Sequence, residues 1–359
     1  MKPTLLALHK YAGLALAVLL GVIGASGSLL VFHDTQDQWL TPALRSTPGS
    51  SRSFDEIIAA AQAAMPDAVP RRLDVSQDQR SPHVVRFPGP DGAPGPIQVA
   101  VSPSTAQVLA VRQWGAYPMS WVYRLHYTLL SGSTGKYVVG VCGLFLLFFC
   151  LSGLYLWWPR AGRWRRAFTV RRDLGAFRFN HDLHQVAGVV LLPVMLIVAF
   201  SGTALVFPAQ VTALVRAVLP VEAPQKVSVA ATGEPVSFDA AIDAARRVFP
   251  EATLTRIDFP DGPGNGYRVA FRQAGEGHGT TRVWVSGAGQ VLATRDARQV
   301  PAGNRFLDWQ FPLHNGAQFG LAGRWLVFVS GWVLVMLCGT GVYLWWRKRR
   351  LQQQARRRR

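Results

Sequence analysis

The chain has little cysteine, and its cysteines form no recognisable pattern. There are three in 359 residues, Cys142, Cys150 and Cys338, and all lie in apolar stretches. No Cys-x-x-Cys pair is present, which disfavours structural disulfides and zinc ribbons. No Cys-x-x-Cys-His is present either, which excludes the usual covalent attachment of haem. The nucleotide fingerprint Gly-x-Gly-x-x-Gly is also missing, so the sequence predicts no flavin or nicotinamide domain.

Acidic residues are scarce, and the excess of positive charge is confined to short segments. Lysine and arginine total 38 against 20 aspartate and glutamate, a net charge of +18. The long segments 34–136 and 208–324 are nearly neutral, and the excess lies at the N-terminus, in residues 160–178 and in the tail 347–359. Basic residues that flank apolar helices mark the cytoplasmic side of a membrane. The charge therefore predicts membrane topology and contact of the tail with anionic lipid, not a nucleic acid partner.

Hydrophobic residues are gathered in long runs rather than spread along the chain. They make up 49% of the sequence, whereas charged residues make up 16%. A helix needs about 20 apolar residues to cross a bilayer. Four blocks reach that length: 9–32, 137–158, 184–207 and 325–346. We therefore expect a multi-pass α-helical membrane protein with four transmembrane helices and both termini in the cytoplasm.

The two halves of the sequence repeat each other. The first apolar block recurs 175 residues later, pairing His9 with His184, Gly13 with Gly188, Ser26 with Ser201, Gly27 with Gly202, and Phe32 with Phe207. A second set recurs 188 residues later, pairing His126 with His314, Cys150 with Cys338, and Gly153 with Gly341. The segment Ser53–Pro66 also matches Ser237–Pro250. Such self-similarity indicates an internal duplication, whose unit is helix, outer domain, helix.

The outer segment of each copy is typical of a small α+β domain. Ser53 and Ser237 are favourable N-caps, and Pro66 and Pro250 follow the helical runs. Strand-like pieces then follow at 72–75, 84–87, 97–101 and 108–111, and at 253–259, 267–271, 282–285 and 291–294. A helix packed on a small antiparallel sheet is the simplest architecture for each copy.

These patterns predict an order of eight segments along the chain. They are a transmembrane helix at 9–33, an outer domain at 34–125, a transmembrane helix with an outer extension at 126–158, a basic cytoplasmic loop at 159–183, a transmembrane helix at 184–207, an outer domain at 208–313, a transmembrane helix with an outer extension at 314–346, and a basic cytoplasmic tail at 347–359.

The repeated motifs resemble those of a known family. The outer unit Ser-Phe-Asp-x-x-Ile, closed by Met-Pro or Phe-Pro, resembles a PepSY domain. The motifs His-x-x-x-Gly, Ser-Gly-x-x-Leu-Val-Phe and Ser/Thr-Gly-x-Tyr-Leu-Trp-Trp resemble the PepSY-associated transmembrane family. The resemblance implies a bacterial inner-membrane protein with two periplasmic PepSY-like domains, often linked to iron uptake. The better understood branch of the family resembles ferric-siderophore reductases that carry two b-type haems.

The resemblance implies that histidines at the helix ends hold two haem b groups. Haem iron readily takes axial histidines, and two axial histidines make an electron-transfer site. The expected ligands are the four histidines that the duplication repeats: His9, His184, His126 and His314. Pseudo-twofold symmetry pairs the first two near the cytoplasmic face and the last two near the outer face. Gly13 and Gly188, one turn beyond the inner pair, are expected to leave room for the porphyrin.

The other histidines have separate interpretations. His33 stands where such proteins often carry arginine, and it is an alternative outer ligand. His181 and His184 have a spacing that also suits a metal ion, although no further ligand is visible, and Asp182 is a candidate to orient an imidazole. Two histidines are expected in loops: His83 and His278. For each predicted haem ligand, an uncoordinated polar side chain at the membrane interface is the alternative.

The resemblance predicts an oxidoreductase that moves electrons outward through the membrane. The expected acceptor is ferric iron in a siderophore or other periplasmic ferric chelate, because reduction to Fe(II) weakens the hold of hard oxygen ligands. The expected donor is a membrane quinol or a separate reductase, since the sequence contains no nucleotide fingerprint. The alternative is a membrane-anchored PepSY protein without redox activity, which modulates a peptidase or senses a ligand.

Overall fold

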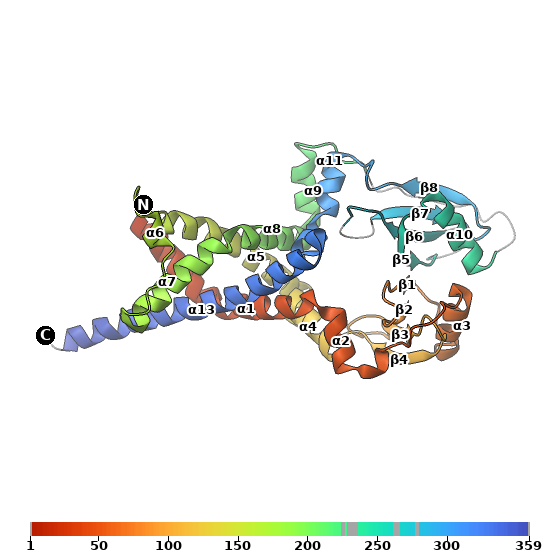
Figure 1. Cartoon of the computed structure of the whole chain (residues 1–359), viewed down its shortest axis with the longest axis horizontal. Coiled ribbons are helices and arrows are strands. Elements are labelled where there is room, and N and C mark those ends of the chain that lie inside the picture. The colour runs from red at the N-terminus through yellow and green to blue at the C-terminus, as the bar shows by residue number, and fades with distance from the viewer. Residues whose placement is uncertain (1, 224–226, 228–235, 261–265, 277–279, 358–359) are drawn as a thin grey trace. The chain divides into compact units, whose positions relative to one another are not determined.

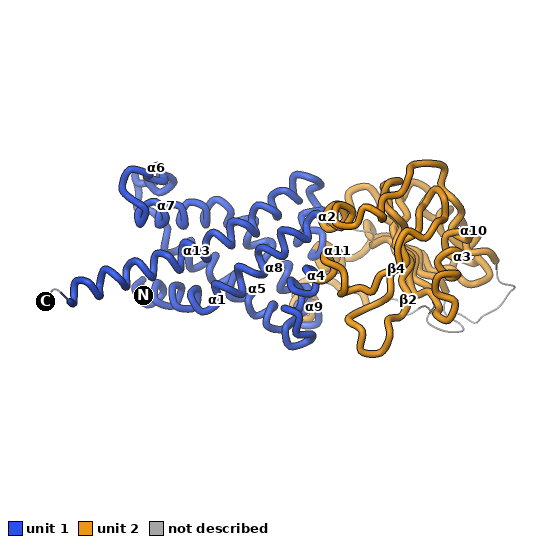
Figure 2. Tube along the Cα trace, turned by 90° about the horizontal axis from the view of Figure 1, so that it is seen from below, with its two compact units in different colours: residues 1–32, 122–211, 310–359 blue, residues 33–121, 212–309 orange. Residues whose placement is uncertain are grey.

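The computed structural model describes residues 2–223, 227, 236–260, 266–276 and 280–357. The chain divides into two compact units, each assembled from segments that are distant in sequence (Figure 2). The helical unit comprises residues 1–32, 122–211 and 310–359, and the sheet unit comprises residues 33–121 and 212–309. Each unit therefore contains residues from both halves of the chain.

Long helices build the helical unit (Figure 1). The main ones are α1 (Lys2–Val31), α5 (Gly132–Trp157), α7 (Gly175–Val190), α8 (Leu192–Val206) and α13 (Gly320–Arg357). Shorter elements are α4 (Pro118–Thr128), α6 (Trp164–Ala167), α12 (Gln310–His314) and the 3-10 helix η2 (Ala317–Phe319). Among the described residues, three helices are long and apolar enough to cross a membrane, or four spans if α7 and α8 count as one. The chain is thus a helical membrane protein.

A proline breaks the third predicted membrane helix. The sequence analysis expected one helix over 184–207, but α7 and α8 meet at an angle of 64°. Pro193 is the second residue of α8. It has no N–H to donate to the carbonyl of residue 189, and its ring excludes that carbonyl, which bends the helix. The equivalent residue in the first half is Val18, and α1 continues unbroken through it.

Small residues bring α1 and α13 close together. α1 packs along α13 and α5, and α5 packs on α8. A Cβ on Gly24 would lie 2.8 Å from the carbonyl oxygen of Gly331, so no larger residue fits at that crossing. Ser28 Oγ donates to the carbonyl of Phe328 at 2.7 Å. Small residues and such interhelical bonds are how membrane helices associate without a hydrophobic driving force.

The sheet unit is built on one eight-stranded antiparallel sheet (Figure 1). Its strands are β1 (Arg72–Asp74), β2 (His83–Phe87), β3 (Ile97–Val101), β4 (Val108–Gln113), β5 (Thr253–Asp258), β6 (Tyr267–Arg272), β7 (Thr281–Val285) and β8 (Val291–Arg295). The order across the sheet is β4-β3-β2-β1-β5-β6-β7-β8. The helices of the unit are α2 (His33–Leu40), η1 (Pro42–Leu44), α3 (Phe54–Ala64), α10 (Phe238–Val248) and α11 (Ala302–Asp308), and α9 (Pro208–Arg216) passes from the helical unit into the sheet unit at residue 212.

The two predicted outer domains are joined edge to edge. β1 pairs antiparallel with β5, with Leu73 opposite Ile257. Both side chains are fully buried in one core shared by α3, α10 and the inward residues of both halves. The sequence analysis located each strand to within about two residues, but it expected two separate domains where the structure has one continuous sheet. Because side chains alternate along a strand, the opposite face of this sheet carries the polar set.

Candidate functional site

His126 and His314 lie next to each other in the helical unit. His126 is near the end of α4, and His314 is the last residue of α12. Their ring centroids are 6.1 Å apart, and the ring planes are inclined at 38°. The structure therefore brings together the two histidines that the sequence analysis paired at the outer face.

Backbone carbonyls set the protonation of both rings. Nδ1 of His126 lies 3.0 Å from the carbonyl oxygen of Ile23, and Nδ1 of His314 lies 3.0 Å from that of Val198. A carbonyl oxygen only accepts, so Nδ1 must carry the proton and donate it. The other nitrogen, Nε2, then keeps its lone pair. This is the tautomer in which a histidine binds metal through Nε2.

A serine-glycine pair holds each of these rings against a helix. A Cβ on Gly27 would lie 2.7 Å from Cε1 of His126, and a Cβ on Gly202 would lie 2.7 Å from Cε1 of His314. Ser26 Oγ is 3.3 Å from the first Nδ1, and Ser201 Oγ is 3.4 Å from the second. The sequence analysis noted these four residues only as repeated positions. Their role depends on which helices pack together, which the repeat does not specify.

The inner histidines use hydroxyl groups in the same way. Nδ1 of His9 lies 2.8 Å from Ser152 Oγ. That hydroxyl donates to the carbonyl of Phe148 at 2.6 Å, so it accepts from the imidazole. His9 is therefore also protonated on Nδ1, with its Nε2 lone pair available.

His184 repeats this arrangement on α13. Its Nδ1 lies 2.9 Å from Thr340 Oγ1, which donates to the carbonyl of Met336 at 2.9 Å. Ser152 and Thr340 are 188 residues apart, the spacing of the second repeat, so they occupy matching positions in the two halves. Among the described residues, the hydrogen bonds of all four histidines use Nδ1 and none uses Nε2.

The glycines that contact the imidazoles differ from Gly13 and Gly188, which the sequence analysis selected to leave room for a porphyrin. A Cβ on Gly13 would lie 4.0 Å from Phe149, and one on Gly188 would lie 3.8 Å from Leu337. These are ordinary contacts, so neither neighbour demands glycine at those positions. The glycines nearest the four rings lie on the partner helices: Gly27, Gly153, Gly202 and Gly341.

The alternative ligand His33 and the candidate orienting acid Asp182 have polar partners of their own. His33 begins α2, and its Nδ1 is 2.9 Å from the exposed carboxylate of its neighbour Asp34. Asp182 pairs with Arg171 at 2.9 Å and with Arg178 at 3.0 Å, and its carboxylate also lies 3.5 Å from Nδ1 of His181. The described part of the chain has no cluster of three or more His, Cys, Asp or Glu residues that could hold a metal ion. An axial haem site needs only two such residues.

His83 is a strand residue rather than a loop residue. It begins β2, is buried, and accepts a hydrogen bond on Nδ1 from the backbone N–H of Ser76 at 3.1 Å. Burial lowers its pKa to about 4. His278, the other predicted loop histidine, lies outside the described residues.

Comparison with known proteins identifies a family and a relative. The family described as the PepSY-associated TM region matches residues 6–348. An uncharacterized protein of Pseudomonas aeruginosa is 28% identical over 256 residues, which are 65% of this chain. The match spans 64% of the length of that relative.

Proposed function

The chain belongs to the family of the PepSY-associated TM region, and from that premise we propose that it is a haem-containing electron-transfer protein of the bacterial inner membrane. The proposed haem ligands are His126 with His314 and His9 with His184. The haems are b-type and not covalently attached, since no Cys-x-x-Cys-His is present.

The spacing of the outer pair carries this proposal. Metal–imidazole bonds are about 2 Å long and Nε2 lies about 1 Å from the ring centre, so two axial imidazoles on one iron have centroids about 6 Å apart. The rings of His126 and His314 are 6.1 Å apart, with Nδ1 of each bonded to a carbonyl. The residues present thus fit an axial pair.

The protein's own groups then fix the ligands. A bound haem supplies a one-electron couple between ferric and ferrous iron. The carbonyls of Ile23 and Val198 orient the outer rings, and the hydroxyls of Ser152 and Thr340 orient the inner ones. Hydrogen bonds to Nδ1 raise the basicity of a metal-binding imidazole, which favours the oxidised state of its metal. The four bonds therefore both position the ligands and tune the potential.

The matching bonds in the two halves support a duplicated architecture with four membrane spans, α7 and α8 forming one of them. We place the N-terminus, the basic residues 160–178 and the tail in the cytoplasm, and the sheet unit in the periplasm. Electrons would enter from a membrane quinol or a separate reductase. The proposed acceptor is a periplasmic ferric chelate such as a ferric siderophore, whose reduction releases the metal without destroying the chelator.

The decisive experiment is haem analysis of the purified full chain. We expect a reduced-minus-oxidised spectrum of b-type haem and two haems per chain. His126→Ala and His314→Ala should each remove one haem and leave the inner one in place. His9→Ala and His184→Ala should remove the inner haem only.

Two other histidine substitutions serve as controls. His33→Gln and His181→Gln replace histidines to which the proposal assigns no haem, so both variants should keep two. A colourless preparation after expression with ample haem would contradict the proposal and favour the non-redox alternative. Loss of haem from a control variant with retention in His126→Ala would contradict the ligand assignment.

A further inference from the structure

Arginines gather on the sheet face that α3 and α10 do not cover. In the register of the central strands, Arg72 lies opposite Asp258, which lies opposite Arg268. One step along the strands, Arg256 is in register with Ala270, then Arg282, then Arg295. We call the set Arg72, Arg256, Arg268, Arg282 and Arg295 the arginine face. It extends over β1, β5, β6, β7 and β8.

The acids on this face are already shared among several arginines. Asp258 is 2.7 Å from Arg72, 2.9 Å from Arg268 and 3.5 Å from Arg256. Burial raises the pKa of this carboxyl, but the charges of the three guanidinium groups outweigh that effect and lower it. One carboxylate thus serves three cations. Asp74, which lies opposite Arg256 on the same face, is bonded to Arg86, so positive charge is left uncompensated.

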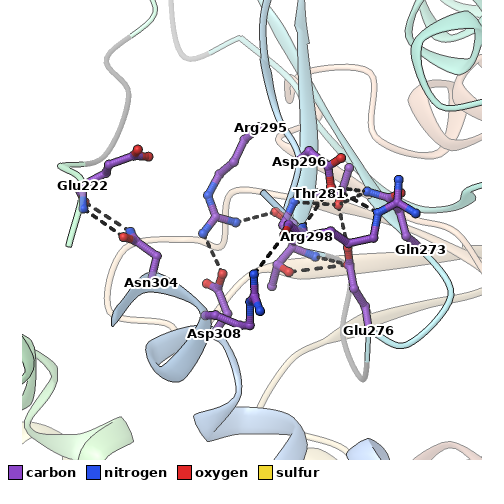
Figure 3. A network of polar contacts seen from close by, with 12 residues as sticks. Glu222, Gln273, Glu276, Thr281, Arg295, Asp296, Arg298, Asn304 and Asp308 are labelled. Carbon is purple, nitrogen blue, oxygen red and sulfur yellow. Dashed lines mark hydrogen bonds and ion pairs between the residues drawn. The ribbon is translucent and has the colours of Figure 1, made fainter. Parts of the chain in front are cut away.

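The ion pair between Arg295 and Asp308 lies at the edge of the sheet. Arg295 donates to Asp308 of α11 at 2.6 Å and to the carbonyl of Thr280 at 2.7 Å (Figure 3). The first bond pairs the charge of Asp308 with Arg295 and holds this arginine toward α11. Asp308 bonds to Arg295, and its charge acts on Arg282 only from a distance.

Arg282 has no acid of its own. Among the described residues no carboxylate lies within ion-pair distance of it, and its Nε is buried without a hydrogen-bond partner. Burial and the charges of Arg268, Arg295 and Arg256 lower its pKa. A buried donor without a partner costs about 1–3 kcal/mol, and more when it is charged. Such a group calls for a partner, which a bound anion can supply.

We propose that the arginine face binds a multivalent carboxylate anion at Arg282, Arg256 and Arg268. Guanidinium groups bind carboxylates through two parallel hydrogen bonds, and several converging arginines select anions with more than one carboxylate. This inference rests on the proposed function. It assigns as the substrate class ferric chelates whose iron is held by carboxylate groups. Trp284, which is opposite Arg268 on β7, supplies an apolar neighbour for the carbon skeleton of such a chelate.

The recessed position of these arginines favours a small ligand over a lipid surface. The side chains of Arg256 and Arg295 are 22% and 18% exposed. Arginines that bind lipid head groups extend into the interface. Arg256 is thus recessed, whereas Arg268 beside it is 40% exposed and open to an anion from solvent.

The test measures binding of gallium(III)–citrate to the full chain in detergent by calorimetry. Gallium(III) mimics ferric iron in its ligands but is not reduced under these conditions, so binding is measured independently of haem and of electron transfer. We expect Arg282→Gln to weaken binding about tenfold, the loss of one charge-assisted pair. Arg298→Gln removes the same charge from an arginine that is 60% exposed and outside the arginine face, so it should bind like the unaltered chain.

Each outcome bears on the proposal. Equal binding by the two variants would overturn it, as would equal binding of a neutral gallium(III)–hydroxamate chelate. Stronger binding of anionic-lipid vesicles or inorganic phosphate than of gallium(III)–citrate would assign the face to phosphate groups and overturn the carboxylate class. A colourless chain that still binds gallium(III)–citrate would refute the proposed electron transfer and leave the site. A haem-loaded chain that does not bind it would refute the site alone.

Discussion

At the scale of single residues, the outer pair depends on atoms of α1 and α8 as much as on the histidines themselves. The carbonyl of Ile23 fixes the tautomer of His126, and Gly27 leaves the space that its ring occupies. At His314 the carbonyl of Val198 fixes the tautomer, and Gly202 leaves the space for the ring. A ligand held this way cannot turn without breaking a hydrogen bond or moving a helix.

Gly27→Ala is therefore expected to displace the ring of His126. The added Cβ would lie 2.7 Å from Cε1, closer than carbon atoms pack. If the chain holds the two proposed haems, the variant should lose most of one of them, measured as haem per chain. Gly21→Ala on the same helix is the matched control, because no atom lies within 4 Å of a Cβ there. Equal haem content in the two variants would show that the ring is not confined by α1.

A buried histidine of the sheet unit predicts how stability depends on pH. The folded pKa of His83 is about 4, below the ordinary value of 6.5, so protons bind more tightly to the unfolded chain. Its contribution is complete above pH 6.5 and is lost as the pH falls toward 4, by about 1.4 kcal/mol per pH unit and about 3 kcal/mol in all. We expect the sheet signal of the full chain in circular dichroism to melt at lower temperature at pH 5 than at pH 7.5.

His83→Gln separates this residue from the other titrating groups. Glutamine does not titrate, so the variant should show a smaller loss of melting temperature between the two pH values. An unchanged loss would mean that other groups, such as the carboxylate of Asp258, govern the acid sensitivity of the sheet.

At the scale of elements, helices α3 and α10 of the sheet unit cap each other. Asp239 accepts from the backbone N–H groups of Phe54 and Asp55 at 3.0 and 2.9 Å. Asp55 in turn accepts from those of Phe238 and Asp239 at 2.9 and 3.2 Å. Each helix therefore carries its own serine cap and a second acid from its partner, at the end where the helix dipole favours negative charge.

Asp55→Ala should thus destabilise both α10 and the junction between the halves. Loss of a side-chain cap costs about 1 kcal/mol, and two N–H groups left without acceptors add to that cost. We expect the free energy of unfolding of the sheet to fall by about 1–2 kcal/mol, measured by denaturant titration. Asp67→Ala, an exposed position just after α3, should change it by less than about 0.5 kcal/mol. A similar loss at both positions would contradict the cross-capping account.

Local patterns in the sequence were sufficient for the elements but not for their assembly. The capping of α3 by Ser53 and the alternating strands depend on neighbouring residues, and both predictions are confirmed. The pairing of β1 with β5 joins residues about 184 apart, and nothing in either strand distinguishes this edge from any other. Pro193 in the sequence indicates a bend, but a prediction from the length of the apolar block alone does not detect it. The partners of the histidines, such as Ser152, become visible only when the helix packing is known.

At the scale of the whole molecule, charge predicts which side of the membrane each unit faces. The uncompensated basic residues lie in the N-terminal part of α1, between α5 and the first turn of α7, and at the C-terminal end of α13, whereas the sheet unit is nearly neutral. We expect the sheet unit outside and the tail inside. Single cysteines at exposed positions, Asp91→Cys in the sheet unit and Gln353→Cys in the tail, test this in a chain whose native cysteines are replaced by serine or alanine.

A membrane-impermeant maleimide added to cells with a permeabilised outer membrane should label Asp91→Cys and not Gln353→Cys. Disruption of the inner membrane should make both reactive, which controls for local shielding of the tail. The opposite pattern would put the histidine pairs in reverse order across the membrane. Electrons passing from the inner to the outer pair would then arrive in the cytoplasm, and a periplasmic ferric chelate could not be the acceptor. Labelling of both sites before disruption would mean that the sheet unit and the tail lie on the same side of the membrane. The chain would then cross the membrane an even number of times between residue 91 and residue 353.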